Sequence, residues 1–443
     1  MARYIIDVLF LMSFLLALFI FPLGPQQQPN TKAKVFVSGA DQGFELIRNG
    51  NAFRIRGASG LGHIKELAAY GGNTLRVYDT TNLSTVLEEA EKYRVAIIVD
   101  IPLLPFNEKY NSYKDSAENE KLKAGVRQLV KRFRHHPALL VWNLGNEVEY
   151  PLVLSENNFI RTFNELIDLI HKEDPDHPVS TAITFPSKRE ILSIGYHSPE
   201  LDLIGFNVFG NIKNLDSELS KIRLLLRPFP FYISEWAHDG PWEATSTKWA
   251  APIEPTSTKK MEQLSERYRM LMSQGKANNL GTLTFYWGQK LESTPTWFST
   301  FYDSNKKSEV LRTLEHLWKD TKNPEPAIGL NYMLIDGLGA PSSLVYRPGQ
   351  RKTAKLTFLE DHSDKLDIHW EVYREAWDLR KWGEGEKLRR IHNAVQLAAG
   401  DSVIFRTPSR EGPYRIFAYV YDSGGYAATA NIPFYVLNEK NGR

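Results

Sequence analysis

The stretch Leu139–Tyr150, LLVWNLGNEVEY, begins as an uninterrupted apolar run and ends in an amide and carboxylates. A continuous apolar run of this kind is typical of a strand whose two faces are both covered, as in a parallel sheet flanked by helices. The segment that follows places Phe159, Phe163, Ile167 and Ile170 at helical spacing. This strand–helix unit predicts an α/β fold.

The same unit recurs along the chain. Eight strands are predicted, at Phe53–Gly57, Asn73–Tyr78, Val95–Asp100, Ala138–Asn143, Pro178–Ile183, Leu201–Asn207, Phe229–Trp236 and Thr282–Trp287. Eight strand–helix units over about 270 residues match the usual size of a (β/α)₈ TIM barrel. A doubly wound open sheet is the alternative, but it normally carries a glycine-rich phosphate turn after its first strand, and RGASGLG is only a weak candidate for one.

The predicted barrel domain covers residues 35–320 and starts with a hairpin that turns at Arg48–Asn51 and closes the bottom of the barrel. Two prolines in TKNPEPA indicate a linker at 321–327. Beyond it the helical patterns stop, and short apolar runs separated by turns predict an all-β, Ig-like sandwich over 328–443.

The N-terminal residues 1–24 carry Arg3 followed by an almost wholly apolar run. This run is longer than the roughly 7–15 residues of a signal-peptide core and shorter than the about 20 of a full membrane span. We expect a signal peptide or an uncleaved signal-anchor helix. The anchor is favoured because Pro22 and Pro25 crowd the cleavage region, and a buried core helix is the alternative. Residues 25–34 read as a flexible linker, and the body of the protein would face the periplasm or exterior from the inner membrane, or be secreted.

Composition excludes several classes of function. The chain contains no cysteine, which rules out thiol catalysis, disulfides and thiolate metal sites. The formal net charge of +2 gives no indication of a nucleic-acid partner. There is no phosphate-binding loop motif, and the adjacent His135 and His136 lack the spacing of metal ligands. We therefore predict neither a cofactor nor a metal, and the sequence does not indicate an oligomeric state.

Polar and aromatic side chains gather where the predicted strands end, which in a barrel is the mouth that carries active sites. Glu147 and Glu235 each end a strongly apolar strand, which puts a costly charge beside a low-dielectric wall. Glu147 could instead serve a helix N-terminus capped by Asn146, and Glu235 could form a structural ion pair. Together, at one mouth, they would make an acid and nucleophile pair for glycoside cleavage.

Four segments carry a resemblance to a known family. HPALLVWNLGNEVE, FYISEW, GGNTLRVY and TFYW resemble the fourth, seventh, second and eighth strand segments of clan A retaining glycoside hydrolases. The sequence is most similar to the TIM-barrel domain of glycoside hydrolase family 2, over about Ala52–Asp320.

The resemblance implies a double-displacement mechanism with Glu235 as nucleophile and Glu147 as acid/base. It further implies that Arg76 keeps Glu235 ionised while the pKa of Glu147 is raised. Asn146 would bind the sugar 2-hydroxyl, and Trp287 would form the floor of the subsite at the cleavage point. The other predicted substrate-binding residues are Asn207, Trp236 and His238, and Asp79 and Asp100 are candidates for distal hydroxyls.

One position departs from the family pattern. Many clan members carry a tyrosine near the end of strand six that hydrogen-bonds the nucleophile, whereas this chain has Phe209. Tyr286, Tyr196 or His197 would have to substitute for it.

The predicted function is a retaining β-glycoside hydrolase, or a transglycosylase, acting on an oligo- or polysaccharide, because the same two glutamates serve both reactions. The alternative is a non-catalytic carbohydrate-binding or envelope scaffold protein with a degenerate barrel, for which Phe209 is the main support. The joint presence of the two glutamates with Arg76, Asn146 and Trp287 argues against that alternative.

Overall fold

The computed structural model describes residues 34–40, 43–106, 111–153, 155–223, 228–273, 277–302, 306–321, 326, 328–360, 366–375 and 388–438. The predicted hydrophobic segment at 1–24, nearly all of the linker at 25–34 and most of the linker at 321–327 lie outside these residues. Within the described ranges, no helix is both long enough and apolar enough to cross a membrane.

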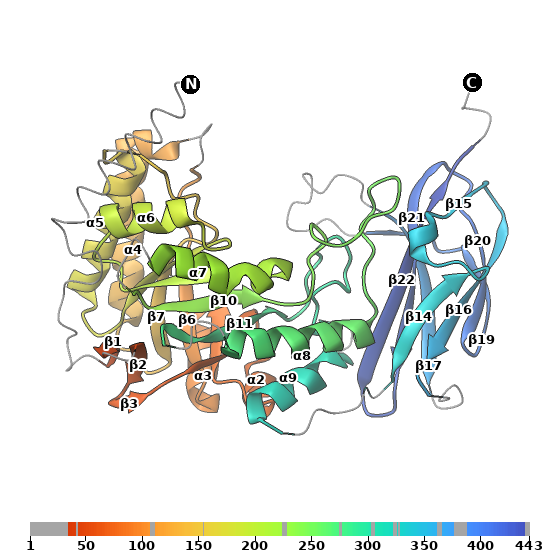
Figure 1. The fold of residues 1–443 in the computed structure, drawn as a ribbon, viewed down its shortest axis with the longest axis horizontal. Helices are drawn as coiled ribbons and strands as arrows, with labels where there is room; N and C mark the ends of the chain where they lie inside the picture. Colours follow the sequence, from red (N-terminus) through yellow and green to blue (C-terminus); the bar gives the residue numbers. More distant parts are fainter. Residues whose placement is uncertain are drawn as a thin grey trace. The chain divides into compact units, whose positions relative to one another are not determined.

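Eight strands close into a barrel in the order β10-β11-β4-β5-β6-β7-β8-β9. Figure 1 labels four of them, β6, β7, β10 and β11. The eight strands are β4 (Ile55–Gly60), β5 (Thr74–Val77), β6 (Ala96–Ile101), β7 (Leu139–Leu144), β8 (Val179–Ile183), β9 (Leu203–Asn207), β10 (Phe231–Trp236) and β11 (Asn279–Trp287). The pairs from β4 to β9 and the pairs of β10 with β9 and β11 are parallel. The predicted TIM barrel is therefore confirmed, with each predicted strand in place.

The helices lie between the strands in the sequence, and amphipathic helices bury one apolar face in packing. They are α2 (Ile64–Ala69), α3 (Leu83–Tyr93), α4 (Ser116–Phe133), α5 (Asn158–Glu173), α6 (Lys188–His197), α7 (Leu215–Arg223), α8 (Ser257–Ser273) and α9 (Val310–Lys319), with short 3₁₀ turns η1 (Ser112–Lys114), η2 (Gly210–Asn214) and η4 (Ala340–Ser342). In α5, Phe159, Phe163, Ile167 and Ile170 are all buried, as their spacing predicts. The Asn157 side chain caps this helix by accepting from the Ile160 N–H.

A small sheet precedes the barrel and consists of β1 (Val35–Ala40), β2 (Gly43–Arg48) and β3 (Asn51–Ala52). The tight turn between β2 and β3 is made by Asn49 and Gly50, which both have left-handed backbone angles. Val35 and Leu46 of this sheet share a core with Ile55, at the start of β4. The predicted hairpin and its turn are therefore present, packed against the amino end of a barrel strand.

The C-terminal region is rich in β-structure and contains two sheets. Its strands are β12 (Phe301–Tyr302), β13 (Lys306–Ser308), β14 (Leu330–Ile335), β15 (Val345–Tyr346), β16 (Arg351–Phe358), β17 (Asp367–Arg374), β18 (Arg389–Arg390), β19 (Val395–Ala399), β20 (Ser402–Arg406), β21 (Gly412–Tyr421) and β22 (Tyr426–Val436). One sheet has the order β14-β16-β20-β19, and the other has the order β12-β13-β22-β21-β17-β18 with β15 beside β22. Leu356 and Phe405 of the first sheet share one hydrophobic core with Ile416 and Phe434 of the second.

The chain divides into two compact units. The first comprises the described residues up to Trp236 together with Arg269–Phe285, and the second comprises Ala237–Tyr268 and the described residues from Tyr286 onward. This division differs from the predicted bounds of 35–320 and 328–443. One reason is that β13, which precedes the predicted linker, pairs with β22 of the C-terminal sheet.

Candidate active site

Arg76, on β5, is fully buried at the centre of a polar cluster in the first unit. Its Nε and Nη2 donate to the two carboxylate oxygens of Asp100, on β6, at 2.9 and 2.7 Å. Its Nη1 donates to Oε1 of Glu235, on β10, at 3.1 Å. One guanidinium therefore pairs with two buried carboxylates. It binds Asp100 through two hydrogen bonds and Glu235 through one.

A tyrosine completes the contacts of Glu235. The Tyr78 hydroxyl, one residue beyond the end of β5, donates to the same Oε1 at 2.9 Å. This bond supplies what Phe209 cannot, since Phe209 instead packs edge-to-face on Phe285. The predicted substitute His197 bonds the Val153 carbonyl instead. The sequence placed Tyr78 at a strand end but gave no sign that it faces the strand-seven glutamate.

Glu147 reaches the same cluster from the loop that follows β7. Asn207 Nδ2 lies 3.1 Å from Glu147 Oε1 and 3.2 Å from Asn146 Oδ1. Arg76 Nη2 also donates to Asn146 Oδ1, at 2.8 Å. Asn146, Asn207 and Arg76 thus connect the two glutamates through one hydrogen-bond network. Glu147 and Asn146 are exposed, whereas Glu235 is 4% exposed.

The backbone around Glu147 is strained. Gly145 has φ of +77° and Glu147 has φ of +50°, a conformation that non-glycine residues seldom adopt. A Cβ on Gly145 would lie 2.6 Å from Val148 Cγ2 and 2.9 Å from Leu103 Cδ1. Such conformations persist where the surrounding structure enforces them, which is common at functional sites. Because Asn157 caps the helix that follows, the alternative reading of Glu147 and Asn146 as its N-terminus is wrong.

A second layer of polar side chains holds the cluster from below. Asn143 Nδ2 donates to Asp100 Oδ1 at 2.8 Å, and the Ser180 hydroxyl donates to Asn143 Oδ1 at 2.7 Å. The Ser234 hydroxyl donates to Asn207 Oδ1 at 2.7 Å. These are polar residues inside apolar strands, and that interruption was the signal by which they could have been found. The role considered for Asp100 in binding distal hydroxyls is wrong, because its oxygens are committed to Arg76 and Asn143.

The electrostatics differ from the expectation that Arg76 holds Glu235 ionised. Burial raises the pKa of Glu235 to about 7, although Arg76 lowers it, and the nearby charge of Glu147 raises it further. Burial likewise raises the pKa of Asp100 despite its bond to Arg76. The physical reason is that a single positive charge is shared between two buried carboxylates, so it does not fully offset the cost of desolvating Glu235.

The other predicted substrate-binding residues, Trp236, Trp287 and His238, are buried side chains. Trp236 and Trp287 are both fully buried. Trp287 packs against Phe301 and Trp318, so it has no exposed ring face for a pyranose, and the predicted floor of the sugar subsite is not present in this structure. His238, which like Trp287 belongs to the second unit, is buried and stacks on Phe298.

Among the residues that the structure describes, no group of three or more His, Asp or Glu side chains is arranged to hold a metal ion.

Residues 73–240 match the model of the TIM barrel domain of glycosyl hydrolases family 2. The match includes Arg76, Glu147 and Glu235, and the predicted resemblance to this family is confirmed. No curated protein sequence matches the chain.

Solved structures with similar folds include the β-D-glucuronidase of Dictyoglomus thermophilum, with a TM-score of 0.51 and 16% identity over 66% of this chain and 55% of that one. The Ruminococcus gnavus β-glucuronidase has a TM-score of 0.51 and 16% identity over 65% and 53%. The Eisenbergiella tayi family 2 β-galacturonidase, bound to galacturonate, has a TM-score of 0.50 and 14% identity over 66% and 55%. At identities this low, the structural similarity shows a shared fold and nothing more. The chain spans about half the length of these proteins.

Proposed function

We propose that this protein is a retaining β-glycosidase, or a transglycosylase with the same chemistry, that acts on an oligo- or polysaccharide. The observation that carries the proposal is the single hydrogen-bond network that joins Glu235 and Glu147 through Arg76, Asn146 and Asn207. The match to a glycoside hydrolase barrel domain over residues 73–240 supports it.

In the first step, ionised Glu235 attacks the anomeric carbon as Glu147 donates a proton to the leaving oxygen, and the glycosidic C–O bond breaks. In the second step, Glu147 takes a proton from water or a sugar hydroxyl, whose oxygen attacks the anomeric carbon and releases Glu235. The contrast in exposure suits these roles. The exposed Glu147 can exchange protons with incoming acceptors, whereas the nucleophile Glu235 is buried.

The hydrogen bonds support proposed roles for individual atoms. Arg76 and Tyr78 both donate to Oε1 of Glu235, which leaves Oε2 as the attacking oxygen. Asn146 Oδ1 accepts from Arg76 and Asn207, which orients its amide so that Nδ2 can donate to a sugar hydroxyl. A sugar hydroxyl bound in this way would be held more tightly in the transition state than in the ground state.

The contact between Tyr78 and Glu235 also removes the main argument for a non-catalytic scaffold, which was the phenylalanine at position 209. We further propose that residues 1–24 hold the protein at a membrane, facing outward, or direct its secretion, on the basis of their apolar composition.

The test is turnover of a panel of aryl β-glycosides that includes a β-glucuronide and a β-galacturonide. Glu235→Gln and Glu147→Gln should each lower kcat/KM by about a thousandfold or more on any substrate that the wild type cleaves. Glu149→Gln, a change at an exposed carboxylate two residues from Glu147, is the matched control and should keep wild-type activity. Undiminished turnover in Glu235→Gln, or no cleavage of any glycan by the wild type, would overturn the proposal.

A further inference from the structure

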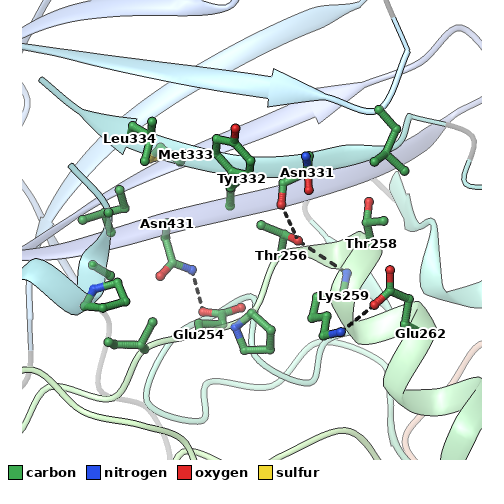
Figure 2. Close-up of a pocket in the computed structure, with 18 residues that line it drawn as sticks. Glu254, Thr256, Thr258, Lys259, Glu262, Asn331, Tyr332, Met333, Leu334 and Asn431 are labelled. Carbon is green, nitrogen blue, oxygen red and sulfur yellow. Dashed lines mark hydrogen bonds and ion pairs between the residues drawn. The ribbon is translucent and has the colours of Figure 1, made fainter. Parts of the chain in front are cut away.

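A cavity of about 450 Å³ lies within the second compact unit. None of the residues of the polar cluster around Arg76 line it. Figure 2 shows its walls, which come from the segment that opens α8, from β14 and from β22. Its volume falls within the range of about 300–1,000 Å³ that is usual for small-molecule sites.

The base of this cavity is built on a fully buried carboxylate. Glu254 Oε1 accepts from Lys260 Nζ at 2.5 Å, and Oε2 accepts from Asn431 Nδ2 at 2.6 Å and from the hydroxyls of Thr294 and Thr296. Burial alone would raise the pKa of Glu254, but Lys260 and these hydrogen bonds bring it below its usual value. The base is therefore a rigid, internally neutralised polar network.

Asn431 presents an oriented amide to the cavity. Its Oδ1 accepts from Arg415 Nη1 at 2.6 Å while one of its N–H groups is used by Glu254. A primary amide carries two N–H groups, so the second is available to a ligand. Figure 2 shows Asn431 and Glu254 joined in this way.

The lining contributed by β14, its neighbouring residues and α8 combines apolar and polar surface. Tyr332, on β14, is 44% exposed, and Leu359 is 55% exposed. On α8, Lys259 pairs with Glu262 at 2.6 Å, so these two charges neutralise each other. The wall thus offers an aromatic ring and a methyl-rich edge beside hydroxyl, amide and paired charged groups (Figure 2).

The hydroxyl of Thr258, a residue that lines the cavity, is buried without a hydrogen-bond partner among the described residues. The residue as a whole is 5% exposed. The oxygen itself is buried, so a ligand hydroxyl in the cavity would pair with it only after the Thr258 side chain turned toward the cavity, and that pairing would relieve the cost of an unsatisfied buried hydroxyl.

We propose that this cavity is a second sugar-binding site, which takes a neutral pyranose unit of a glycan. A pyranose has apolar C–H faces that stack on aromatic rings and a rim of hydroxyls that both donate and accept, and the lining of the cavity matches both. The charged side chains that line it are paired, Glu254 with Lys260 and Glu262 with Lys259, so the described lining offers no unpaired charge to a charged sugar. The choice of a glycan rests in part on the proposed function, whereas the site itself does not.

The test measures binding of neutral cello-, manno-, xylo- and laminari-oligosaccharides to the Glu235→Gln protein by calorimetry. Adding Tyr332→Ala should weaken binding by about fivefold or more through loss of ring stacking. Thr258→Val should weaken it by about three- to tenfold while leaving the fold as stable or more so, because it removes the unpaired hydroxyl. That combination separates a ligand contact from a structural role.

A third variant fills the cavity without removing any group. Gly339 lies in its wall with φ of −90°, and a Cβ there would make ordinary contacts with Pro341 and Leu334, at 3.5 and 3.7 Å. Gly339→Leu should therefore block binding at no backbone cost. Tyr196→Ala removes a tyrosine of similar exposure, 41%, from α6 and is the matched control, with binding unchanged.

Hydrogen exchange locates the bound ligand, and protection should appear at residues 253–262 and 330–334. The proposal is overturned if no neutral oligosaccharide binds, if these segments gain no protection, if the three cavity variants bind as well as the control, or if an oligogalacturonate binds better than the neutral sugars. Failure of the proposed function has a separate signature, since the wild type would then release no cleavage product in chromatography, whatever this cavity binds.

Discussion

Arg76 and Asp100 form a bidentate ion pair, with N···O distances of 2.9 and 2.7 Å, directly beside the carboxylate of the candidate nucleophile. The pair leaves Glu235 with one N–H of the guanidinium, at 3.1 Å. Asp100 is therefore a competitor for the positive charge, and its own negative charge raises the pKa of Glu235. The pH response of the site follows from this competition.

The first prediction concerns that response. Glu235 must be ionised to attack, and its pKa is about 7, so kcat/KM should rise with pH through an acid limb near pH 7. Asp100→Asn removes the competing negative charge and should move this limb down to about pH 6. The pH dependence of kcat/KM measures both. An acid limb that stays near pH 7 in Asp100→Asn would contradict the explanation.

The second prediction concerns stability. The folded state has a higher pKa at Glu235, about 7, than the ordinary value of 4.5, so between these values the folded protein binds more protons than the unfolded one. Its free energy of unfolding should fall as pH rises through this window, and the penalty is complete above pH 7. Glu235→Gln should therefore stabilise the protein by on the order of 1–3 kcal/mol at pH 8 and by nearly nothing at pH 4. Thermal unfolding at the two pH values measures this, and an equal effect at both would refute the sign.

The third prediction concerns Tyr78. Its hydrogen bond lowers the pKa of Glu235 and fixes Oε1, so Tyr78→Phe should raise the acid limb and reduce kcat by about 10- to 100-fold with little change in KM. Tyr196→Phe, at an exposed tyrosine, serves as the control. A change confined to KM would indicate that Tyr78 contacts substrate rather than the nucleophile.

The fourth prediction identifies the nucleophile directly. A 2-fluoro-glycoside of a cleaved sugar should trap a glycosyl-enzyme, and peptide mass spectrometry should find the label on Glu235. The label should be absent from Glu235→Gln. Labelling of Glu147 would reverse the two roles.

The fifth prediction concerns Gly145, whose φ of +77° equals that of Gly50. A Cβ at Gly50 meets nothing within 4 Å, whereas a Cβ at Gly145 collides with Val148 and Leu103. Gly50→Ala should cost about 1 kcal/mol for the left-handed backbone alone, while Gly145→Ala should cost about 2–4 kcal/mol and displace Glu147. Denaturant unfolding and kcat of both variants compare the two effects, and equal losses would mean that packing around Gly145 is unimportant.

The barrel was predictable because most of its strands are largely apolar runs, interrupted by single polar residues such as Asn143 and Ser234, so that even approximate bounds located the strand ends. Arg76, Glu147 and Glu235 lie at those ends. The partner of the nucleophile was not predictable in the same way. Polar and apolar residues alternate clearly along a strand when one of its faces is exposed to solvent. Because β5 is buried on both faces, its sequence does not reveal that Tyr78 turns toward β10.

The predicted sugar-binding role of Trp287 was wrong for a related reason. A tryptophan at a strand end fits a sugar platform and a packed core equally well, and only the positions of Phe301 and Trp318 decided between them for Trp287. The pKa of Glu235 depends on how many carboxylates share the charge of Arg76. That number follows from the way β5, β6 and β10 come together in the barrel, which the sequence does not show.

The two donors to Oε1 of Glu235 stand two residues apart at the end of one short strand. An Arg-x-Tyr signature after the second barrel strand therefore offers a search criterion for similar barrels that lack a tyrosine on the sixth. In protein engineering, the same feature frees position 209: because the hydroxyl comes from elsewhere, that phenylalanine can be varied to change its packing on Phe285 while the hydrogen bonds of Glu235 are kept.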